Sequence, residues 1–328
     1  MSADSESRPV VDVHAHLTPQ RFVRAVADGG SFHGMTDADG ELWNPRNLWE
    51  PSQRIDEMDE HGVDVQVISP TDCFYQYQRE PSVTARIAAE VNEEVAETVR
   101  AHPTRFRGIG TLPMQDPDLA VSHLRELVTE FGLTGVMIDD HVCGVLYDDP
   151  RFEELWSALE ELGAWVLIHQ FEPTSVTYRT ENYFLLNSIG NLVDRALTFS
   201  AFVYGGVMDR HPDLKVCLAH AGGYTPYALD RLDRGWEVWP DMRGQAADRP
   251  STYVKRFYYD TVTFTTANLR FMLDTVGADR VVLGSDWPAP MRVHDPVGVI
   301  ATSDVISEDE RDAVLRGNVA GLLPGVPA

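Results

Sequence analysis

Short apolar runs alternate with longer amphipathic stretches along almost the whole chain. The runs are rich in β-branched residues and carry few polar positions, which is typical of strands buried on both faces of a parallel sheet. Eight such runs occur, at residues 10–13, 63–68, 106–110, 135–138, 164–168, 214–219, 257–259 and 281–284.

The stretches between these runs show the spacing of amphipathic helices. The clearest ones cover residues 80–101, 118–131, 149–162 and 188–210. Asp116 and Asp149 each precede a proline at the start of such a stretch, where an aspartate caps a helix and a proline fits its first turn. Strands that alternate with helices throughout predict an α/β fold, and eight of them predict a TIM (β/α)8 barrel that forms one domain over residues 1–328.

An open, doubly wound parallel sheet is the alternative fold. It is disfavoured because no G-x-G-x-x-G sequence follows an early strand: Gly108 and Gly110 are followed by Thr111, Leu112 and Pro113. Two long irregular stretches, 17–49 and 224–256, follow predicted strands. In a barrel they are expected to be insertions over the C-terminal face, where such loops form the active site.

Composition narrows the class of protein. Of 328 residues, 43% are hydrophobic, and 51 acidic against 27 basic residues give a net charge of -24. Such a charge disfavours nucleic acid and anionic membranes as partners. No apolar run approaches the roughly 18 residues of a transmembrane helix, and the polar N-terminus does not resemble a signal peptide, so a cytoplasmic location is expected. Cys73, Cys143 and Cys217 are too dispersed to form a C-x-x-C site or a disulfide framework.

Histidine or aspartate stands at or directly after four of the eight predicted strands. His14 and His16 follow the first, His169 the fifth, His220 the sixth, and Asp286 comes two residues after the eighth. Residues two apart on an extended backbone point to the same side, so His14 and His16 supply half of a possible metal site. Each residue alone also fits a buried, hydrogen-bonded histidine or a helix cap. A ring of them at the barrel mouth favours a catalytic site.

This arrangement resembles the amidohydrolase superfamily, and most closely its second amidohydrolase family with the aminocarboxymuconate-semialdehyde decarboxylase branch. The resemblance extends along almost the whole chain and implies a distorted barrel of the metal-dependent hydrolase type. Matching segments are RIDEMD at 54–59 with GV at 62–63, GTLPMQ at 110–115, GGV at 205–207, HP at 211–212, LKVC at 214–217, HAGG at 220–223 and GSDWPAP at 284–290.

The resemblance implies a metal site and a catalytic base. One divalent metal ion would be bound by His14, His16, His169 and Asp286. The catalytic residues would be Asp286 and His220, and His220 would act as general base beside a water on that ion. Three nitrogens and one oxygen suit Zn²⁺ best, and Mn²⁺ or Fe²⁺ are alternatives. Members of the wider superfamily with two metals carry a bridging Lys or Glu at the end of the fourth strand, whereas residues 139–141 read DDH here, so one metal is expected.

The resemblance also indicates a small carboxylate substrate. Decarboxylases of this branch hold substrate carboxylates with two arginines, one of them from a partner subunit. Arg46 lies one residue from the first of these positions, and Trp287 stands where tyrosine is common, so both are predicted to bind substrate. Trp239 occupies the second arginine position, with Arg234 and Arg243 nearby as solvated residues or substitutes.

The sequence is compatible with three functions: decarboxylation, hydrolysis or hydration, and a non-catalytic scaffold role. The preferred one is non-oxidative decarboxylation of a small unsaturated or aromatic acid, and the alternative is hydrolysis or hydration of an amide, lactone or related bond with the same activated water. A non-catalytic scaffold would lack ligands, and none is missing; no G-x-S-x-G occurs either. The family implies a homodimer, for which Trp236, Trp239 and Met242 offer apolar surface.

Overall fold

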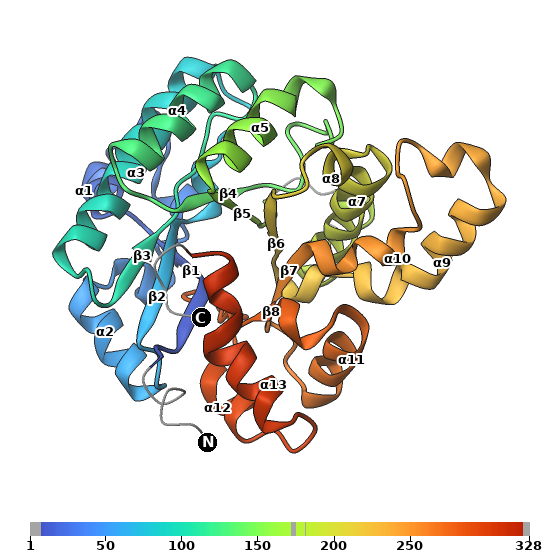
Figure 1. The fold of residues 1–328 in the computed structure, drawn as a ribbon. Coiled ribbons are helices and arrows are strands. Elements are labelled where there is room, and N and C mark those ends of the chain that lie inside the picture. The colour runs from blue at the N-terminus through green and yellow to red at the C-terminus, as the bar shows by residue number, and fades with distance from the viewer. Residues whose placement is uncertain (1–7, 172–174, 181, 324–328) are drawn as a thin grey trace.

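The structure is a computed structural model that describes residues 8–171, 175–180 and 182–323. Its centre is formed by eight strands that all run parallel, in sequence order (Figure 1). They are β1 (Val11–Leu17), β2 (Val65–Pro70), β3 (Phe106–Gly108), β4 (Gly135–Ile138), β5 (Trp165–Ile168), β6 (Lys215–Leu218), β7 (Phe257–Asp260) and β8 (Val281–Val282). All eight predicted strands are therefore confirmed.

The strands form a three-stranded sheet, β1 to β3, and a five-stranded sheet, β4 to β8, and two isolated parallel bridges (here called seams) join the two sheets into a barrel. One seam is a parallel bridge between Gly110 and Val136, where a Cβ on Gly110 would lie 2.1 Å from a methyl carbon of Leu127. The other seam is a parallel bridge between Ala15 and Trp287. The sheet thus curves into a distorted barrel, as predicted, and the open-sheet alternative is wrong.

Helices surround the strands as an outer layer (Figure 1). They are α1 (Gln20–Val26), α2 (Pro51–Glu60), α3 (Pro81–Ala101), α4 (Pro117–Thr129), α5 (Glu153–Leu162), α6 (Thr177–Thr180), α7 (Asn191–Tyr204), α8 (Val207–Arg210), α9 (Thr225–Val238), α10 (Pro250–Tyr253), α11 (Thr266–Val276), α12 (Pro296–Ala301) and α13 (Glu308–Asp312). Asp116 caps α4 by accepting a hydrogen bond from the Leu119 amide at 3.1 Å. Within the described ranges, no helix combines the length and the apolar character needed to cross a bilayer.

The stretch 188–210, predicted as one helix, is divided. A π-helical turn (Leu186–Gly190) leads into α7, and Gly205 and Gly206 separate α7 from α8. Gly206 has a φ of +68°, a backbone conformation that glycine adopts without steric cost and that ends a helix.

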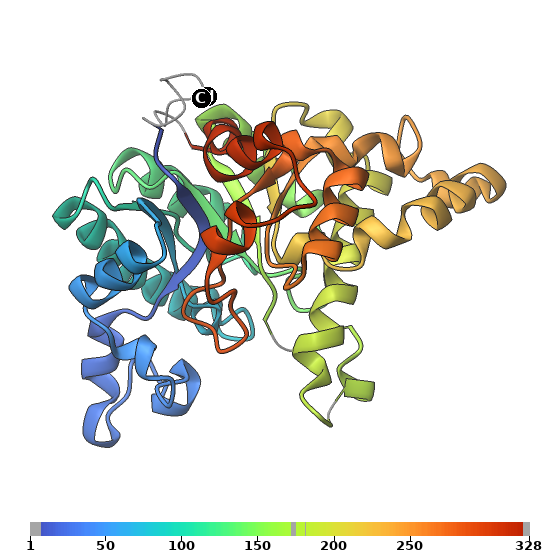
Figure 2. The ribbon, with the colours of Figure 1, turned by 90° about the horizontal axis from the view of Figure 1, so that it is seen from below.

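The C-terminal ends of the strands lie on the lower side of Figure 2, opposite the face seen in Figure 1. The insertion 17–49 covers this side with α1 and several short 3-10 turns, as expected. The expectation for 224–256 is wrong: most of it is helical, and α9 packs beside α7, α10 and α11 and projects sideways from the barrel. The apolar residues of α9 repeat with helical spacing, and its buried face needs a helical neighbour. The segment after β5 extends below the mouth instead (Figure 2).

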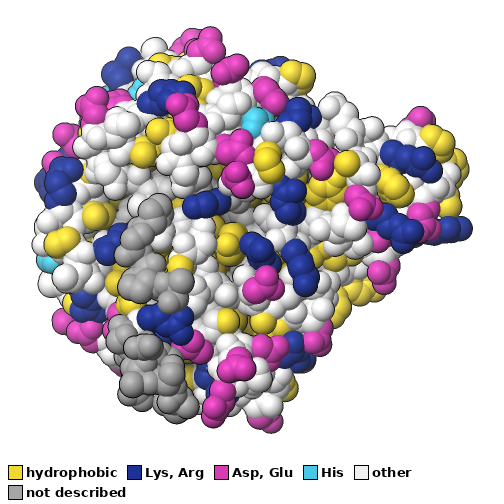
Figure 3. All heavy atoms as spheres, in the orientation of Figure 1, with side chains coloured by type: hydrophobic (Ala, Val, Ile, Leu, Met, Phe, Trp, Pro, Cys, Tyr) yellow, Lys and Arg dark blue, Asp and Glu magenta, His cyan; other side chains and the backbone are white. Residues whose placement is uncertain are grey.

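The opposite, N-terminal face carries no concentration of one charge in the view of Figure 3, where acidic, basic and apolar side chains are interspersed over the described residues. The polar residues that the sequence places at strand ends lie on the other face. The predicted site residues therefore lie at the opposite end of the barrel from the face drawn in Figure 3.

Candidate active site

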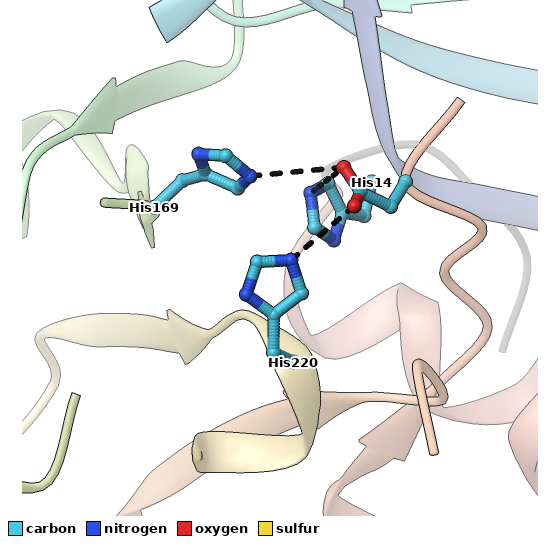
Figure 4. A group of neighbouring side chains, drawn as sticks. His14, His169 and His220 are labelled. Atoms are coloured by element: carbon cyan, nitrogen blue, oxygen red, sulfur yellow. Dashed lines mark hydrogen bonds and ion pairs between the residues drawn. The ribbon is translucent and has the colours of Figure 1, made fainter. Parts of the chain in front are cut away.

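Four histidines and one aspartate converge at the mouth of the barrel. His14 and His16 lie within β1, His169 directly follows β5, His220 begins a 3-10 turn after β6, and Asp286 follows β8. Figure 4 shows the rings of His14, His169 and His220 directed toward one another from three elements of the barrel. The structure thus brings together all five residues that the sequence placed at strand ends.

The Asp286 carboxylate lies at the centre of the group. Its Oδ1 is 3.1 Å from His16 Nε2, 3.3 Å from His14 Nε2 and 3.7 Å from His169 Nε2. Its Oδ2 is 3.4 Å from His220 Nε2. Ring centroids of His16 and His169 are only 4.6 Å apart. One carboxylate therefore faces four imidazole nitrogens.

The backbone places two of these residues in a rare conformation. His220 has a φ of +54° and Asp286 a φ of +65°, both in the left-handed region that non-glycine residues seldom adopt. Gly223, also with positive φ, packs against α7, where a Cβ would lie 2.6 Å from the Leu192 carbonyl oxygen. Such conformations cost roughly 1–3 kcal/mol each and concentrate at functional sites, so the turn after β6 is held in place to aim His220.

The second ring nitrogen has a hydrogen-bonding neighbour in His14 and His16, but not in His169. His14 Nδ1 is 2.6 Å from Asp260 Oδ2, and His16 Nδ1 is 3.0 Å from the Ser69 hydroxyl. His169 Nδ1 lies 3.8 Å from Asp72, too far for a hydrogen bond. Asp260 is not among the predicted site residues, because the seventh predicted run ends at residue 259. The same strand-end rule, extended by one residue, would have found it.

Burial and the carboxylates drive the pKa values of the rings in opposite directions. Burial lowers the pKa of His16 to about 4 and that of His169 well below its usual range. Burial also acts on His14, but the Asp286 and Asp260 carboxylates outweigh it and raise the His14 pKa to about 10. Burial opposes the charge of Asp286 too, yet His14 and the other rings hold its pKa well below the ordinary value.

Three buried ring nitrogens of the site lack a hydrogen-bond partner among the described residues. His14 Nε2 and both nitrogens of His169 are buried without a hydrogen-bond partner in the described part of the chain. Unpaired buried nitrogens are destabilising unless another group satisfies them. Imidazoles around a carboxylate are also the donor set of zinc and related divalent cations. The residues present therefore fit a metal ion.

The predicted metal ligands are not the same set as the residues whose ligand atoms lie nearest to one another. His14, His169, His220 and Asp286 offer ligand atoms that all lie within 4.8 Å of one another. His16, a predicted ligand, is outside that set, whereas His220, the predicted base, is inside it. His220 is also the most exposed of the four rings, at 13% of its side chain.

Arg46 and Trp287, the predicted substrate-binding residues, lie together, and their side chains hydrogen-bond to a glutamate instead of a histidine ring, although the Trp287 carbonyl accepts from the His16 amide at 2.6 Å. Both contact Glu57 of α2: Arg46 Nε donates to its Oε2 at 3.1 Å, and the Trp287 indole N–H donates to the same oxygen at 3.2 Å. The Arg54 guanidinium lies 3.9 Å from the centre of the Trp287 ring. A cavity of about 370 Å³ beside Arg46 and Glu57 is also lined by Trp49. We call these residues (Arg46, Trp49, Arg54, Glu57, Trp287 and Arg292) the Glu57 cluster.

Arg234 and Arg243 lie on the projecting arm of α9 and the turn after it. Arg234 pairs with Glu237, and Arg243 lies over the Trp236 ring at 5.1 Å. Both side chains therefore contact neighbours on the arm itself, as expected for solvated residues.

Comparison with known proteins identifies similar chains. Residues 11–324 match the model of an amidohydrolase family. A 2-amino-3-carboxymuconate-6-semialdehyde decarboxylase of Dictyostelium discoideum is 30% identical over 95% of this chain and 91% of its own length. The crystal structure of 5-carboxyvanillate decarboxylase from Sphingomonas paucimobilis superposes with a TM-score of 0.84 at 29% identity, covering 96% of this chain and 99% of that one. A dihydroxybenzoic acid decarboxylase from Polaromonas, solved with bound manganese and the inhibitor 2-nitroresorcinol, gives a TM-score of 0.82 at 25% identity over 96% of both chains.

Proposed function

The chain belongs to the amidohydrolase family, and on that premise we propose that it catalyses the metal-dependent, non-oxidative decarboxylation of a small aromatic or unsaturated carboxylic acid. The observation that carries this proposal is the group of buried, unpaired imidazole nitrogens around Asp286 at the barrel mouth. The fold relatives named above are decarboxylases of acids of this kind.

We assign the metal ligands as His14, His16, His169 and Asp286, and expect one divalent ion. Zinc suits three nitrogens and one oxygen, and the manganese in the Polaromonas enzyme supports Mn²⁺ as an alternative, with Fe²⁺ as a third. When bound, such an ion supplies a Lewis acid that polarises a substrate oxygen and lowers the pKa of water.

His220 is proposed to move the proton. Its ring is the most exposed of the four, and its Nε2 is 3.4 Å from Asp286 Oδ2, so it borders both the metal ligands and the mouth. Decarboxylation requires a proton on the carbon that carries the carboxylate. The carbon–carbon bond then breaks, its electron pair returns to the ring or double bond, and CO2 leaves. An imidazole within hydrogen-bond reach is suited to give or take that proton.

A homodimer is proposed on the exposed apolar surface of the projecting arm and the segment below the mouth. Tyr183 is 91%, Tyr227 71% and Trp239 64% exposed, which is unusual for large aromatic side chains. Figure 3 also shows apolar side chains where the arm leaves the barrel. Sedimentation velocity should give twice the chain mass of 36.7 kDa; a single species at the chain mass would contradict the dimer.

A direct test is to incubate the metal-loaded protein with hydroxylated benzoates, carboxyvanillates and aminocarboxymuconate semialdehydes while measuring CO2 release. We expect CO2 from at least one of these acids, and none after chelation. Parallel reactions with amides and lactones distinguish the hydrolase alternative: hydrolysis of these without CO2 from any acid would contradict decarboxylation.

A further inference from the structure

Asp260 occupies a position between the metal ligands and the turn that carries His220. It ends β7, and its side chain is fully buried. Its two oxygens face one imidazole and three backbone amides, which come from the adjoining strands and loops. No charged side chain other than His14 lies within ion-pair distance of it among the residues with described positions.

Four N–H groups converge on this carboxylate. Oδ2 lies 2.6 Å from His14 Nδ1 and accepts from the His220 amide at 2.8 Å. Oδ1 accepts from the Ala221 amide at 2.7 Å and from the Val262 amide at 3.1 Å. An ionised carboxylate has about four lone-pair sites and no proton to donate. His14 must therefore carry its proton on Nδ1.

When His14 is neutral, as a metal ligand must be, this proton on Nδ1 leaves the lone pair on Nε2. His14 Nε2 is the nitrogen that faces Asp286, at 3.3 Å, and it has no hydrogen-bond partner in the described chain. A metal ligand must present a lone pair, and the partner of the second ring nitrogen decides which nitrogen does so. Asp260 thus selects the ligating tautomer.

Gly284 makes this contact possible. Strand β8 runs between β7 and β1, so the Asp260 side chain has to reach across it to His14. A Cβ on Gly284 would lie 2.7 Å from Asp260 Cβ and 3.0 Å from His14 Cβ. Only glycine leaves room there for the carboxylate and the imidazole to meet.

We propose that Asp260 is a positioning residue that fixes the His14 tautomer for metal binding and at the same time holds the backbone of His220 in its left-handed turn. One buried carboxylate then couples a ligand to the proton-transferring residue. This inference rests on the proposed metal site.

Asp260→Asn tests it, because an amide cannot accept from all four N–H groups. If the NH2 of the new asparagine points toward His14, it opposes the His220 amide, which is also a donor, and favours a His14 ring protonated on Nε2. If the NH2 points the other way, it opposes the amide donors of Ala221 and Val262. Zinc titration of the metal-free protein by calorimetry should show affinity about 10- to 100-fold weaker than wild type, the usual effect of losing such a partner. At saturating zinc, kcat should fall while KM is unchanged.

Asp12→Asn is the matched control. Asp12 is equally buried and accepts from the His14 and Ser285 amides, the Ser285 hydroxyl and the Gln66 amide, but contacts no imidazole side chain. Its zinc affinity should fall by less than about 10-fold. Equal losses in the two variants, or an Asp260→Asn protein that binds zinc like wild type, would overturn the role of Asp260. A wild-type protein that binds no zinc or other divalent metal would instead contradict the proposed function.

Two measurements avoid dependence on that variant folding. In the zinc-loaded wild type, ¹⁵N NMR of histidine should show the His14 resonance, assigned by its loss in His14→Gln, with a proton on Nδ1; a proton on Nε2 would refute the inference. Gly284→Ala should weaken zinc binding by forcing His14 and Asp260 apart, whereas Gly317→Ala, whose Cβ meets only the Arg8 side chain at 3.5 Å and the Asp312 carbonyl oxygen at 3.9 Å, should not.

Discussion

Two carboxylates near the barrel mouth, Asp286 and Glu57, face different kinds of partner. Glu57 accepts from Arg46 and from the Trp287 indole through Oε2, and Arg292 lies 3.5 Å from its Oε1. These groups can only donate. Asp286 faces four imidazoles, each of which can donate, accept or bind a metal depending on its protonation.

We propose that this difference separates a structural cluster around Glu57 from a metal-binding site around Asp286. Obligate donors satisfy the Glu57 carboxylate within the protein, so the Glu57 cluster is complete by itself. Imidazoles leave buried nitrogens unpaired around Asp286, and an external group has to complete them. The same reasoning places Asp260 between the two, because it faces three obligate donors and one ring.

The largest effect should come from removing a ligand on the Asp286 side. His169→Ala should abolish metal binding and reduce turnover to the level of the chelated wild type, since both of its nitrogens are buried and unpaired. Elemental analysis and CO2 release measure the two losses together. Retained metal at one equivalent per chain would show that His169 is not a ligand.

The next effect should come from His220. His220→Asn should keep about one metal per chain but lower kcat by about 10² to 10⁴, the usual contribution of a positioned acid or base. His16→Ala is the contrasting variant and should lose the metal. Near-wild-type turnover of His220→Asn across pH would eliminate its role in proton transfer.

On the Glu57 side, Trp287→Phe should affect stability and not catalysis. It removes one hydrogen bond to a charged group, which is worth about 1.5–3 kcal/mol of unfolding free energy. Chemical denaturation measures this loss, and KM should be unchanged. A raised KM with unaltered stability would instead support the sequence-based prediction that Trp287 binds substrate.

The smallest effect should be the pH dependence of the Glu57 cluster. Burial would raise the Glu57 pKa, but Arg46 and Trp287 outweigh it and hold that pKa below its ordinary value. The pairing therefore stabilises the fold above the unfolded-state pKa, roughly 4.3, and is lost as pH falls below it toward the folded value. Glu57→Gln should show a shallower decline of stability than wild type in that range, followed by denaturation of the metal-free proteins. Parallel declines would mean that Glu57 is not specifically paired.

The apolar runs predicted the strands well because each strand is buried on both faces. His14, His16, His169, His220 and Asp286 were found because parallel strands end at one face. Other features depend on contacts distant in sequence. Trp287 directly follows Asp286, but the left-handed backbone at Asp286 directs the indole to α2.

The stretch 224–256 was mistaken for a covering loop because sequence spacing does not say where a helix packs. Asp260 was missed because the seventh predicted run ended one residue before it, at 259. Its partners, His14 and the His220 turn, become visible only when β1, β6 and β7 are assembled.

Anomalous diffraction from a zinc-loaded crystal would locate the metal ion and identify its ligands. We expect one peak per chain, about 2.0–2.2 Å from ring nitrogens of His14, His16 and His169 and from an oxygen of Asp286. His220 should stand outside bonding distance of that peak. A peak bonded to His220 in place of His16, two peaks, or none at the mouth would contradict the proposed metal site.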